Sequence, residues 1–523
     1  MHLQKPGKLT KYTAITFAPV QGFIEKSRKL RDLYGASLIL SYLSQQLVKA
    51  AAKSTQVISP ALASVQKGTP NRILIKGEFS EEQLKQTLSS TWNRLLQECR
   101  QWIEAKVPDT YHWEREWTHW GNHTWEIFWG SGDSILDAMK DLETRKLSRN
   151  WTAVNWIGES SSITGTDAIA FPGLGAETRN PNNRKWTDEK AEIKTFYHRL
   201  ACVLENLPPD GKPEGKFFAL NEKLSIPELV KRLVTLPEIA NRLGMENLVE
   251  SFSEIYRRPE IKHQQGAGRW TGWFMADGDK VGEHLQSLAK KPNGDEEIHK
   301  FSQAMRDWGK DFSKEFPPDI GRVIYAGGDD FLGVIFSDKD KAPITLQDAF
   351  QWLITIPQQW QQHKQNIGLS LGLVWAAHSV PQRDILQHCR QAEKVAKNSG
   401  RARATIRIVF NSGQYVQWTC PWDYLDILTK YQDREKQKNW SHIYQDFAQL
   451  QSRRAFNIEK DTLLNNFPLE FFDIYFPGEG KKLRNPDCAK HIVGFSDEED
   501  TTKATIDWMS DLIKVGWHLC SNT

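Results

Sequence analysis

The chain has 523 residues, with 68 basic and 65 acidic side chains and a formal net charge of +3. This length predicts about three or four domains, and the charge balance excludes a histone-like or tail-driven nucleic-acid binder, although it is compatible with a local basic groove. No run approaches the ~20 apolar residues of a membrane helix, and residues 1–12 lack the apolar core of a signal peptide, so we expect a cytoplasmic protein without a membrane partner.

The first part of the chain alternates apolar strand patterns with amphipathic helix patterns. In chain order, the periodicity predicts a strand, a helix, a strand, a helix and a strand, at residues 12–18, 36–52, 72–77, 80–106 and 123–130. No paired acids stand at a hairpin tip here. This first domain, residues 1–150, has a less regular version of the strand and helix order that is found again at residues 266–412. Residues 151–265 begin with a linker rich in Asn, Gly and Pro and continue as a helical domain.

The plan is clearer in the second copy, at residues 266–412. Strand patterns lie at 270–277, 322–328, 331–336, 367–377 and 402–410, and helix patterns at 282–291, 298–316, 345–364 and 382–398. This order is that of the ferredoxin-like split β-α-β unit, which is also the plan of polymerase palms and nucleotide cyclases. We therefore expect an α+β fold with two ferredoxin-like palm domains, of which only the second carries an acidic site, and a helical domain at 413–523.

Asp329 and Asp330 stand side by side behind Gly327 and Gly328, between two apolar strand patterns. Glycines can adopt the positive φ angles of a two-residue hairpin, and they let a ligand approach the backbone. Adjacent carboxylates repel each other, and burial raises that cost. Without further context, the same four residues are equally typical of a solvated turn, because Asp is common in turns.

A third acid favours a metal site over a solvated turn. Asp277 ends the strand pattern at 270–277, which neighbours the hairpin in a split β-α-β sheet. Three acids that converge from two adjacent strands are the layout of two-metal phosphoryl or nucleotidyl transfer, and Mg²⁺ takes one or two carboxylates together with substrate phosphates. Asp277, Asp329 and Asp330 are therefore the candidate catalytic residues and the candidate ligands of two Mg²⁺ or Mn²⁺ ions.

Substrate phosphates also need cations, and basic residues crowd the end of the last palm helix and the turn after it: Lys394, Lys397, Arg401 and Arg403. Lys397 is the candidate for a triphosphate, although basic residues at helix C-termini also complement the helix dipole. The candidate nucleotide-binding residues are Gly278, Gly327, Gly328, Lys397 and Arg401.

Weaker patterns have simpler explanations. The six cysteines contain no C-x-x-C pair, so we expect reduced thiols and no zinc. The tryptophans among His112, His119 and His123 favour an aromatic loop or a subunit contact over a zinc site. A basic run is typical of a solvated helix face, with contact to nucleotide or RNA phosphates as the second interpretation; it contains Lys26, Arg28, Lys29 and Arg31.

Four stretches resemble a known family. The segment FAPVQGFIEKSRKLRDLYGASLILSYL (17–43) is similar to the entry of the first palm in the Cmr-type large subunit of type III CRISPR effector complexes. DGDKVGEHL (277–285), YAGGDDFLGVI (325–335) and AEKVAKNSGRA (392–402) resemble its second palm. The resemblance covers the chain from its N-terminus to about residue 412.

The resemblance implies an RNA-guided subunit whose pair of palms polymerises ATP into cyclic oligoadenylate when the complex binds target RNA. It implies that Asp277, Asp329 and Asp330 hold the metals, that ATP is the substrate, and that the partners are the other Cmr-type subunits, guide crRNA and target RNA. Fuller family members begin with an HD nuclease domain. None of the 14 histidines here is followed by Asp, so we expect a short form without that domain.

Two other functions stay open. A diguanylate cyclase-like enzyme acting on GTP also fits the GGDDF hairpin at 327–331, although the motif at 17–43 and the paired palm plan argue against it. The large subunit could also be a catalytically silent scaffold, against which the intact acids and glycines argue. Incubation with labelled ATP and GTP distinguishes all three.

Overall fold

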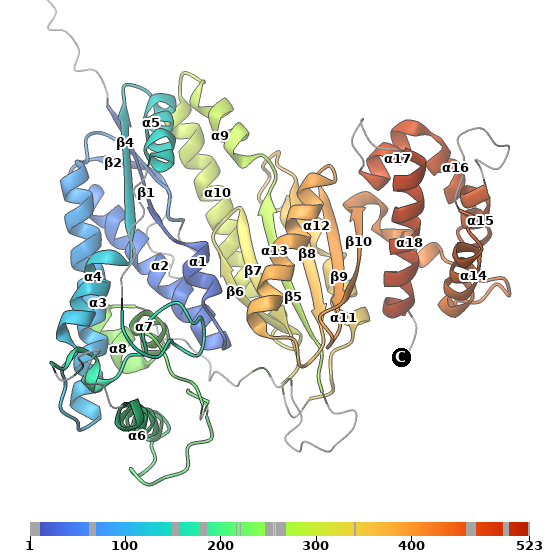
Figure 1. Ribbon diagram of the computed structural model, residues 1–523. Helices are drawn as coiled ribbons and strands as arrows, with labels where there is room; N and C mark the ends of the chain where they lie inside the picture. Colours follow the sequence, from blue (N-terminus) through green and yellow to red (C-terminus); the bar gives the residue numbers. More distant parts are fainter. Residues whose placement is uncertain are drawn as a thin grey trace, which may run out of the picture. The chain divides into compact units, whose positions relative to one another are not determined.

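The computed structural model describes residues 11–61, 70–148, 156–177, 179, 186–215, 217–219, 221–245, 255, 257, 268–338, 341–456, 467–494 and 501–520. The chain divides into two compact units (Figure 1). The first contains residues 1–254 and 285–310, and the second contains 255–284 and 311–523. The expected domain boundaries near residues 150 and 265 lie outside the described residues, so they stay predictions.

The first unit contains a four-stranded antiparallel sheet in the order β2-β3-β1-β4. Its strands are β1 (Tyr12–Ala18), β2 (Gln56–Ser59), β3 (Ile73–Lys76) and β4 (Glu126–Gly132). Chain order and spatial order together are those of the split β-α-β unit. The short strand β2 was missing from the sequence analysis, because four residues show too little alternation to identify a strand.

Alternation along these strands separates two packed faces. Ile15 and Ile73 belong to the main core, together with buried residues of α2 (Leu30–Ala51) and α3 (Glu81–Lys106). On the other face α5 (Ile135–Leu147) packs against β4 and β1. The unit also contains α1 (Gln21–Glu25), α4 (Glu114–His123), η1 (Pro172–Gly175), α6 (Trp186–Leu204), α7 (Ile226–Leu233), α8 (Pro237–Leu243) and residues of α10 (Gly294–Glu315) up to Lys310.

A buried ion-pair network joins α2 to α7 in the first unit. Arg232 on α7 is fully buried and donates to Asp32 Oδ1 at 2.6 Å and to Glu222 Oε2 at 2.7 Å. Both carboxylates are also buried. The Arg232 guanidinium holds the pKa of Asp32 below its usual range, against the opposing effect of burial. Gly35 on α2 permits this close packing, because a Cβ there would lie 1.8 Å from the Lys231 carbonyl oxygen.

The second unit contains a six-stranded sheet in the order β10-β9-β8-β5-β7-β6. Its strands are β5 (Thr271–Gly278), β6 (Gly321–Ala326), β7 (Asp330–Ile335), β8 (Leu369–Ala376), β9 (Arg403–Val409) and β10 (Tyr415–Pro421). The four strands β8-β5-β7-β6 repeat the order of the first sheet, and β9 extends them in parallel to β8. The predicted α+β class with two palm-like sheets is confirmed.

Helices cover both faces of this second sheet. The helix α13 (Gln382–Asn398) lies across β8, β9 and β5 (Figure 1). Gly372 on β8 allows this approach, because a Cβ there would lie 2.6 Å from the backbone nitrogen of Glu393. On the other face Phe274 contacts Phe316 and Trp352, with ring centroids 5.7 and 4.4 Å away. The second unit also contains α11 (Leu346–Leu353) and α12 (Ile356–Gln361), whereas α9 (Val281–Ala289) is divided between the two units after residue 284.

The region after residue 412 differs from the all-helical pattern predicted for it. Its first residues form β10, which pairs with β9 at the edge of the sheet. The helices that follow are η2 (Trp422–Lys430), α14 (Trp440–Ser452), α15 (Phe467–Tyr475), α16 (Glu479–Arg484), α17 (Pro486–Val493) and α18 (Thr501–Cys520), and α18 packs on β10. None of the described helices has the length and apolar character needed to cross a membrane.

We expect Arg232→Met to destabilise the first unit by about 3–5 kcal/mol, because it leaves two buried carboxylates without their cation. Urea unfolding followed by hydrogen exchange of the α7 peptides measures this loss. The control is Arg242→Met, whose guanidinium pairs with Glu238 while 47% exposed and should cost less than about 1 kcal/mol. Equal midpoints for the two variants would contradict the assigned role of Arg232.

Candidate active site

Two predicted site residues face each other across neighbouring strands. Asp277 on β5 pairs with Asp330 on β7 in the antiparallel register. Residues directly opposite each other point to the same face, with Cβ atoms about 5 Å apart. That face is also the one covered by α13, since Lys397 on α13 contacts Asp277. The sheet therefore brings two carboxylates together where β5 ends and β7 begins, as the sequence predicted. We call this end of the two strands the acidic edge.

The turn that presents the adjacent acids is built by glycines. Gly328 has a φ of +130°, whereas Gly327 is outside the left-handed region, so the expectation of positive φ is met only by Gly328. The Gly327 N–H donates to the Asp330 carbonyl at 2.8 Å. The Gly278 N–H donates to the Asp329 carbonyl at 2.8 Å, and a Cβ on Gly278 would lie 3.2 Å from the Asp329 Cβ. Gly278 thus allows the end of β5 to approach the acidic turn.

Lys397 lies among carboxylates. Its ammonium group donates to Asp277 Oδ2 and forms an ion pair with Glu393 Oε1 at 2.6 Å. These two carboxylates raise the pKa of Lys397, against the opposing effect of burial. Glu393 was not singled out from the sequence, although its position four residues before Lys397 places both side chains on one helix face. In this structure Lys397 neutralises part of the acidic edge.

The electrostatics of the acidic edge are dominated by burial and like charge. Burial and the neighbouring carboxylates of Asp329 and Asp277 raise the pKa of Asp330 to about 8, while a hydrogen bond from the Tyr325 hydroxyl acts in the opposite direction. Burial also raises the pKa of Asp277, opposed by Lys397. Lys397 therefore neutralises only part of the negative charge of these carboxylates, and a bound cation would reduce the repulsion that remains.

This donor set fits a hard divalent cation. Carboxylate oxygens are the ligands that Mg²⁺ and Mn²⁺ prefer, and the raised pKa of Asp330 marks the position at which positive charge is needed. Among the described residues, however, no group of three or more Asp, Glu, His or Cys side chains is already arranged as a metal cage. Substrate phosphates normally complete such a coordination shell for Mg²⁺.

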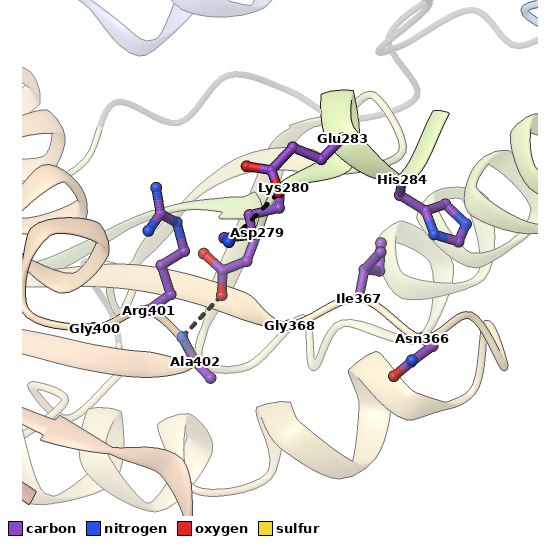
Figure 2. Close-up of a pocket in the computed structure, with 10 residues that line it drawn as sticks. All are labelled: Asp279, Lys280, Glu283, His284, Asn366, Ile367, Gly368, Gly400, Arg401 and Ala402. Carbon is purple, nitrogen blue, oxygen red and sulfur yellow. Dashed lines mark hydrogen bonds and ion pairs between the residues drawn. The ribbon is translucent and has the colours of Figure 1, made fainter. Parts of the chain in front are cut away.

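Asp279 is a buried acid that the sequence analysis did not single out. It is 7% exposed; its Oδ1 accepts from the Ser370 hydroxyl at 2.6 Å and its Oδ2 from the Ala402 N–H at 2.8 Å. Figure 2 shows its carboxylate directed at the backbone of Ala402. The D-G-D spacing was a usable signal, because it places a second acid directly after the end of β5. Asp279 fixes the turn that follows α13.

A cavity of about 540 Å³ lies beside Asp279 and is lined by residues that include Lys280, Glu283, His284, Gly400 and Arg401 (Figure 2). Arg401 and Ala402 have positive φ angles of 66° and 47°, which the turn imposes on two residues that both carry a Cβ. Two exposed cations, Lys280 and Arg401, line the cavity together with the acids Asp279 and Glu283, and Glu283 Oε2 lies 3.4 Å from the Lys280 ammonium group. The predicted residues thus fall into two neighbouring groups, because Lys397 and the acidic pair are not part of this lining.

Other predicted features have structural roles. The segment that contains His119 and His123 is the helix α4 rather than a loop. Trp117 on this helix and Trp113 directly before it are buried in the core of the first unit. Arg403 is buried and donates to the backbone carbonyl of His491 at 2.9 Å. The basic run of the first unit makes internal contacts: Lys26 with Asp167, Arg28 with Glu222, Lys29 with the Gly215 carbonyl and Arg31 with Thr235.

Comparison with known proteins gives two family matches. Residues 270–405 match the family model of the Cas10/Cmr2 second palm domain, and residues 12–69 match that of the CRISPR-associated protein Cmr2 N-terminal region. Both matches fall where the sequence analysis placed its motifs. They confirm the predicted resemblance to a Cmr2/Cas10-type large subunit, with a nucleotidyl cyclase-like palm in its second half. No curated protein matches the chain.

One solved structure supports the fold, and a second gives a weaker match. A chain of a type III-B Cmr-beta complex in its apo state is 11% identical, with a TM-score of 0.56, and the alignment covers 97% of this chain and 82% of that one. A chain of a Csm1–Csm4 cassette in complex with one ATP is 13% identical, with coverages of 98% and 70% and a TM-score of 0.47. The first likeness supports the fold alone, and the second is too weak to carry an argument.

We expect Asp279→Ala to loosen the turn at residues 399–402, because the Ala402 N–H loses its acceptor and Ser370 loses its partner. Hydrogen exchange of peptides covering 399–403 should become faster by about tenfold, as expected for one lost charged hydrogen bond. Asp319→Ala, which removes an 83% exposed carboxylate, should leave these peptides unchanged. Unaltered exchange in Asp279→Ala would show that the turn is held by other contacts.

Proposed function

We propose that the chain is the large subunit of a type III RNA-guided effector complex and that its second unit converts ATP into cyclic oligoadenylate. The observation that carries the proposal is the Asp277–Asp330 pair beside a cavity lined by Lys280 and Arg401. Paired acids next to a cavity that offers Lys280 and Arg401 suit a nucleoside triphosphate with its metal ions, because metal-binding and phosphate-binding groups must lie within one triphosphate length of each other.

In this proposal the acids of the sheet edge hold two Mg²⁺ or Mn²⁺ ions. The ligands are Asp277, Asp329 and Asp330, and the ions supply charge neutralisation for the attacking and leaving oxygens. The chain's own task is to bring the three carboxylates together despite their repulsion. The antiparallel pairing of β5 with β7 places Asp277 opposite Asp330, and the close approach at Gly278 brings the Cβ of Asp329 near the end of β5.

The reaction joins two ATP molecules. The 3′-hydroxyl of one ATP loses its proton to water and its oxygen attacks the α-phosphorus of the other; a new O–P bond forms, the bond from the α-phosphorus to the bridging oxygen breaks, and pyrophosphate leaves. Repetition lengthens the chain, and attack of its terminal 3′-oxygen on the α-phosphorus of its own 5′-triphosphate closes the ring and releases a last pyrophosphate. Arg401 and Lys280 bind phosphate oxygens, and the turn held by Asp279 orients Arg401.

Lys397 has a charge-balancing role in this proposal. It forms ion pairs with Asp277 and Glu393, which reduces repulsion among the carboxylates. When cations and phosphates arrive, its ammonium group can turn toward the phosphates, because a lysine side chain has four rotatable bonds. The same residue then stabilises both the free and the bound state.

Other subunits, guide RNA and target RNA are the proposed partners. The fold shared with a chain of a type III-B Cmr-beta complex supports this part. The matched Cas10/Cmr2 second palm model favours it over a diguanylate cyclase-like GTP enzyme. The acidic pair beside a cavity that contains Lys280 and Arg401 favours an active subunit over a silent scaffold.

Asp329→Ala combined with Asp330→Ala should abolish oligoadenylate synthesis and leave RNA-guided assembly intact, because it removes metal ligands at an edge that assembly does not need. Product formation from labelled ATP by the target-bound complex measures activity, and co-purified RNA measures assembly. Labelled GTP is run in parallel. Persistent ATP product in the double variant would contradict the site, and a product from GTP alone would favour the alternative enzyme.

Arg401→Met should raise the KM for ATP by about tenfold or more, because one charge-assisted hydrogen bond to a phosphate is worth about 1.5–3 kcal/mol. The backbone strain at this position is the same for both residues, so the comparison isolates the guanidinium. The matched control is Arg383→Met, which removes a 61% exposed guanidinium at the other end of α13. An unchanged KM for Arg401→Met would remove this residue from the phosphate site.

A further inference from the structure

A second cavity lies at the opposite end of α13. Its volume is about 440 Å³, and its walls are the start of α13 and the hairpin between β9 and β10. Asp384 on this wall precedes Lys397 by 13 residues, which corresponds to about 20 Å along a helix. The cavity is therefore separate from the proposed ATP site, although both belong to the second unit.

A buried arginine stands behind the cavity wall. Arg407 on β9 is 2% exposed. It donates to Gln417 Oε1 at 2.6 and 3.1 Å, to Gln391 Oε1 at 2.9 Å and to His388 Nδ1 at 2.9 Å. All these acceptors are neutral groups. A buried guanidinium that is solvated only by amides and an imidazole keeps its positive charge uncompensated, and it polarises the groups to which it donates.

These contacts fix which atoms the cavity walls offer to a ligand. His388 Nδ1 accepts from Arg407, so the ring proton is on Nε2; burial and Arg407 also lower the pKa of His388, which keeps the ring neutral. Gln391 uses its oxygen for Arg407, and Asn411 uses its oxygen for the N–H and hydroxyl of Ser379. Each of the three residues therefore has N–H groups left to donate, and all three line the cavity.

One acceptor stands next to these donors. Asp384 lies one helical turn before His388 and also lines the cavity; its Oδ1 lies 3.5 Å from Arg383 Nε, and its Oδ2 is the acceptor considered for a ligand. A bare phosphate or carboxylate has only acceptors, so Asp384 would repel it. A fitting ligand has a donor adjacent to an acceptor, and the Watson–Crick edge of every nucleobase has this pattern. Tyr415, which is 46% exposed, has its ring centroid 5.4 Å from that of His388, with the Arg407 guanidinium 4.2 Å from its own centroid.

We propose that this cavity binds the Watson–Crick edge of one unstacked nucleobase of single-stranded RNA, with Tyr415 as the adjacent aromatic surface. Single-stranded RNA is recognised in this way by proteins, through hydrogen bonds to splayed bases and contact with aromatic rings. The identification of RNA as the source of the base rests on the proposed function. The hydrogen-bonding pattern itself does not depend on ATP turnover.

The test measures RNA binding without catalysis. The full chain carrying Asp329→Ala and Asp330→Ala is titrated with a fluorescent single-stranded 12-nucleotide RNA, with the same RNA in a duplex, and with a version that has abasic sites. We expect the single strand to bind about tenfold more tightly than the abasic strand, while the duplex, whose base edges are already paired, competes poorly. Equal affinity for the abasic strand would overturn the proposal, because the protein would then read only the backbone.

Two variants localise the effect. Asn411→Asp keeps an oxygen for Ser379 but replaces the amide donor, and Tyr415→Ala removes the exposed ring; each should shrink the advantage of the normal strand over the abasic one. Tyr444→Ala, at another exposed tyrosine (38%), is the matched control. A photoreactive 4-thiouridine strand should cross-link to peptides covering 380–391 or 410–415, and cross-links confined to other peptides, or none, would refute the assignment.

A source other than RNA is distinguished by competition. If nucleoside monophosphates displace the strand completely at millimolar concentration while abasic RNA does not, the cavity reads a free base equally well and the base-edge assignment stands. If they compete no better than ribose 5-phosphate, the assignment fails. Neither arm involves ATP conversion, so a failure here leaves the proposed enzymatic activity untouched, and the reverse also holds.

Discussion

The second unit is organised around the repulsion between Asp277 and Asp330. The antiparallel register places these two residues on the same face of the sheet. Like charges at this distance in a partly buried position are costly, and the surrounding residues offset the cost in several ways. Lys397 pairs with Asp277, Tyr325 donates to Asp330, and the proton affinity of Asp330 rises. Gly278 and Gly328 permit this arrangement, because the first lets the acidic turn approach the end of β5 closely and the second adopts the positive φ angle of that turn.

The two units solve the problem of buried charge differently, although their sheets have the same strand order. In the first unit, Arg232 lies between Asp32 and Glu222, so the buried charges are of opposite sign and nearly complete their own hydrogen bonding. Such a network holds two helices together and offers nothing to a ligand. In the second unit the excess negative charge is left for a cation to complete. One fold thus supports both a closed and an open electrostatic arrangement, which is why the site rather than the fold carries the function.

Much of the architecture could be predicted from the sequence because it depends on local periodicity. Apolar strand patterns and amphipathic helices predicted every strand of the two sheets except β2 and β10, and the acids at 277 and 330 could be placed together by the palm plan of the second sheet alone. The features that were missed depend on contacts distant in sequence. Asp279 is bound to Ser370 and Ala402, and no local pattern shows these partners. The basic run near residue 28 has the pattern of a solvated helix face, and its partners on other elements cannot be identified from that pattern. The strand β10 was missed because it begins a region whose remaining pattern is helical.

The two hydrogen bonds of Asp279 also have a consequence for how the protein is made. They join residues separated by 91 and 123 positions along the chain, and loop closure over such lengths occurs only once the intervening strands are in place. The cavity beside Asp279 therefore cannot form on a nascent chain that ends before Ala402. A nucleotide that binds only the finished turn would stabilise that turn by mass action.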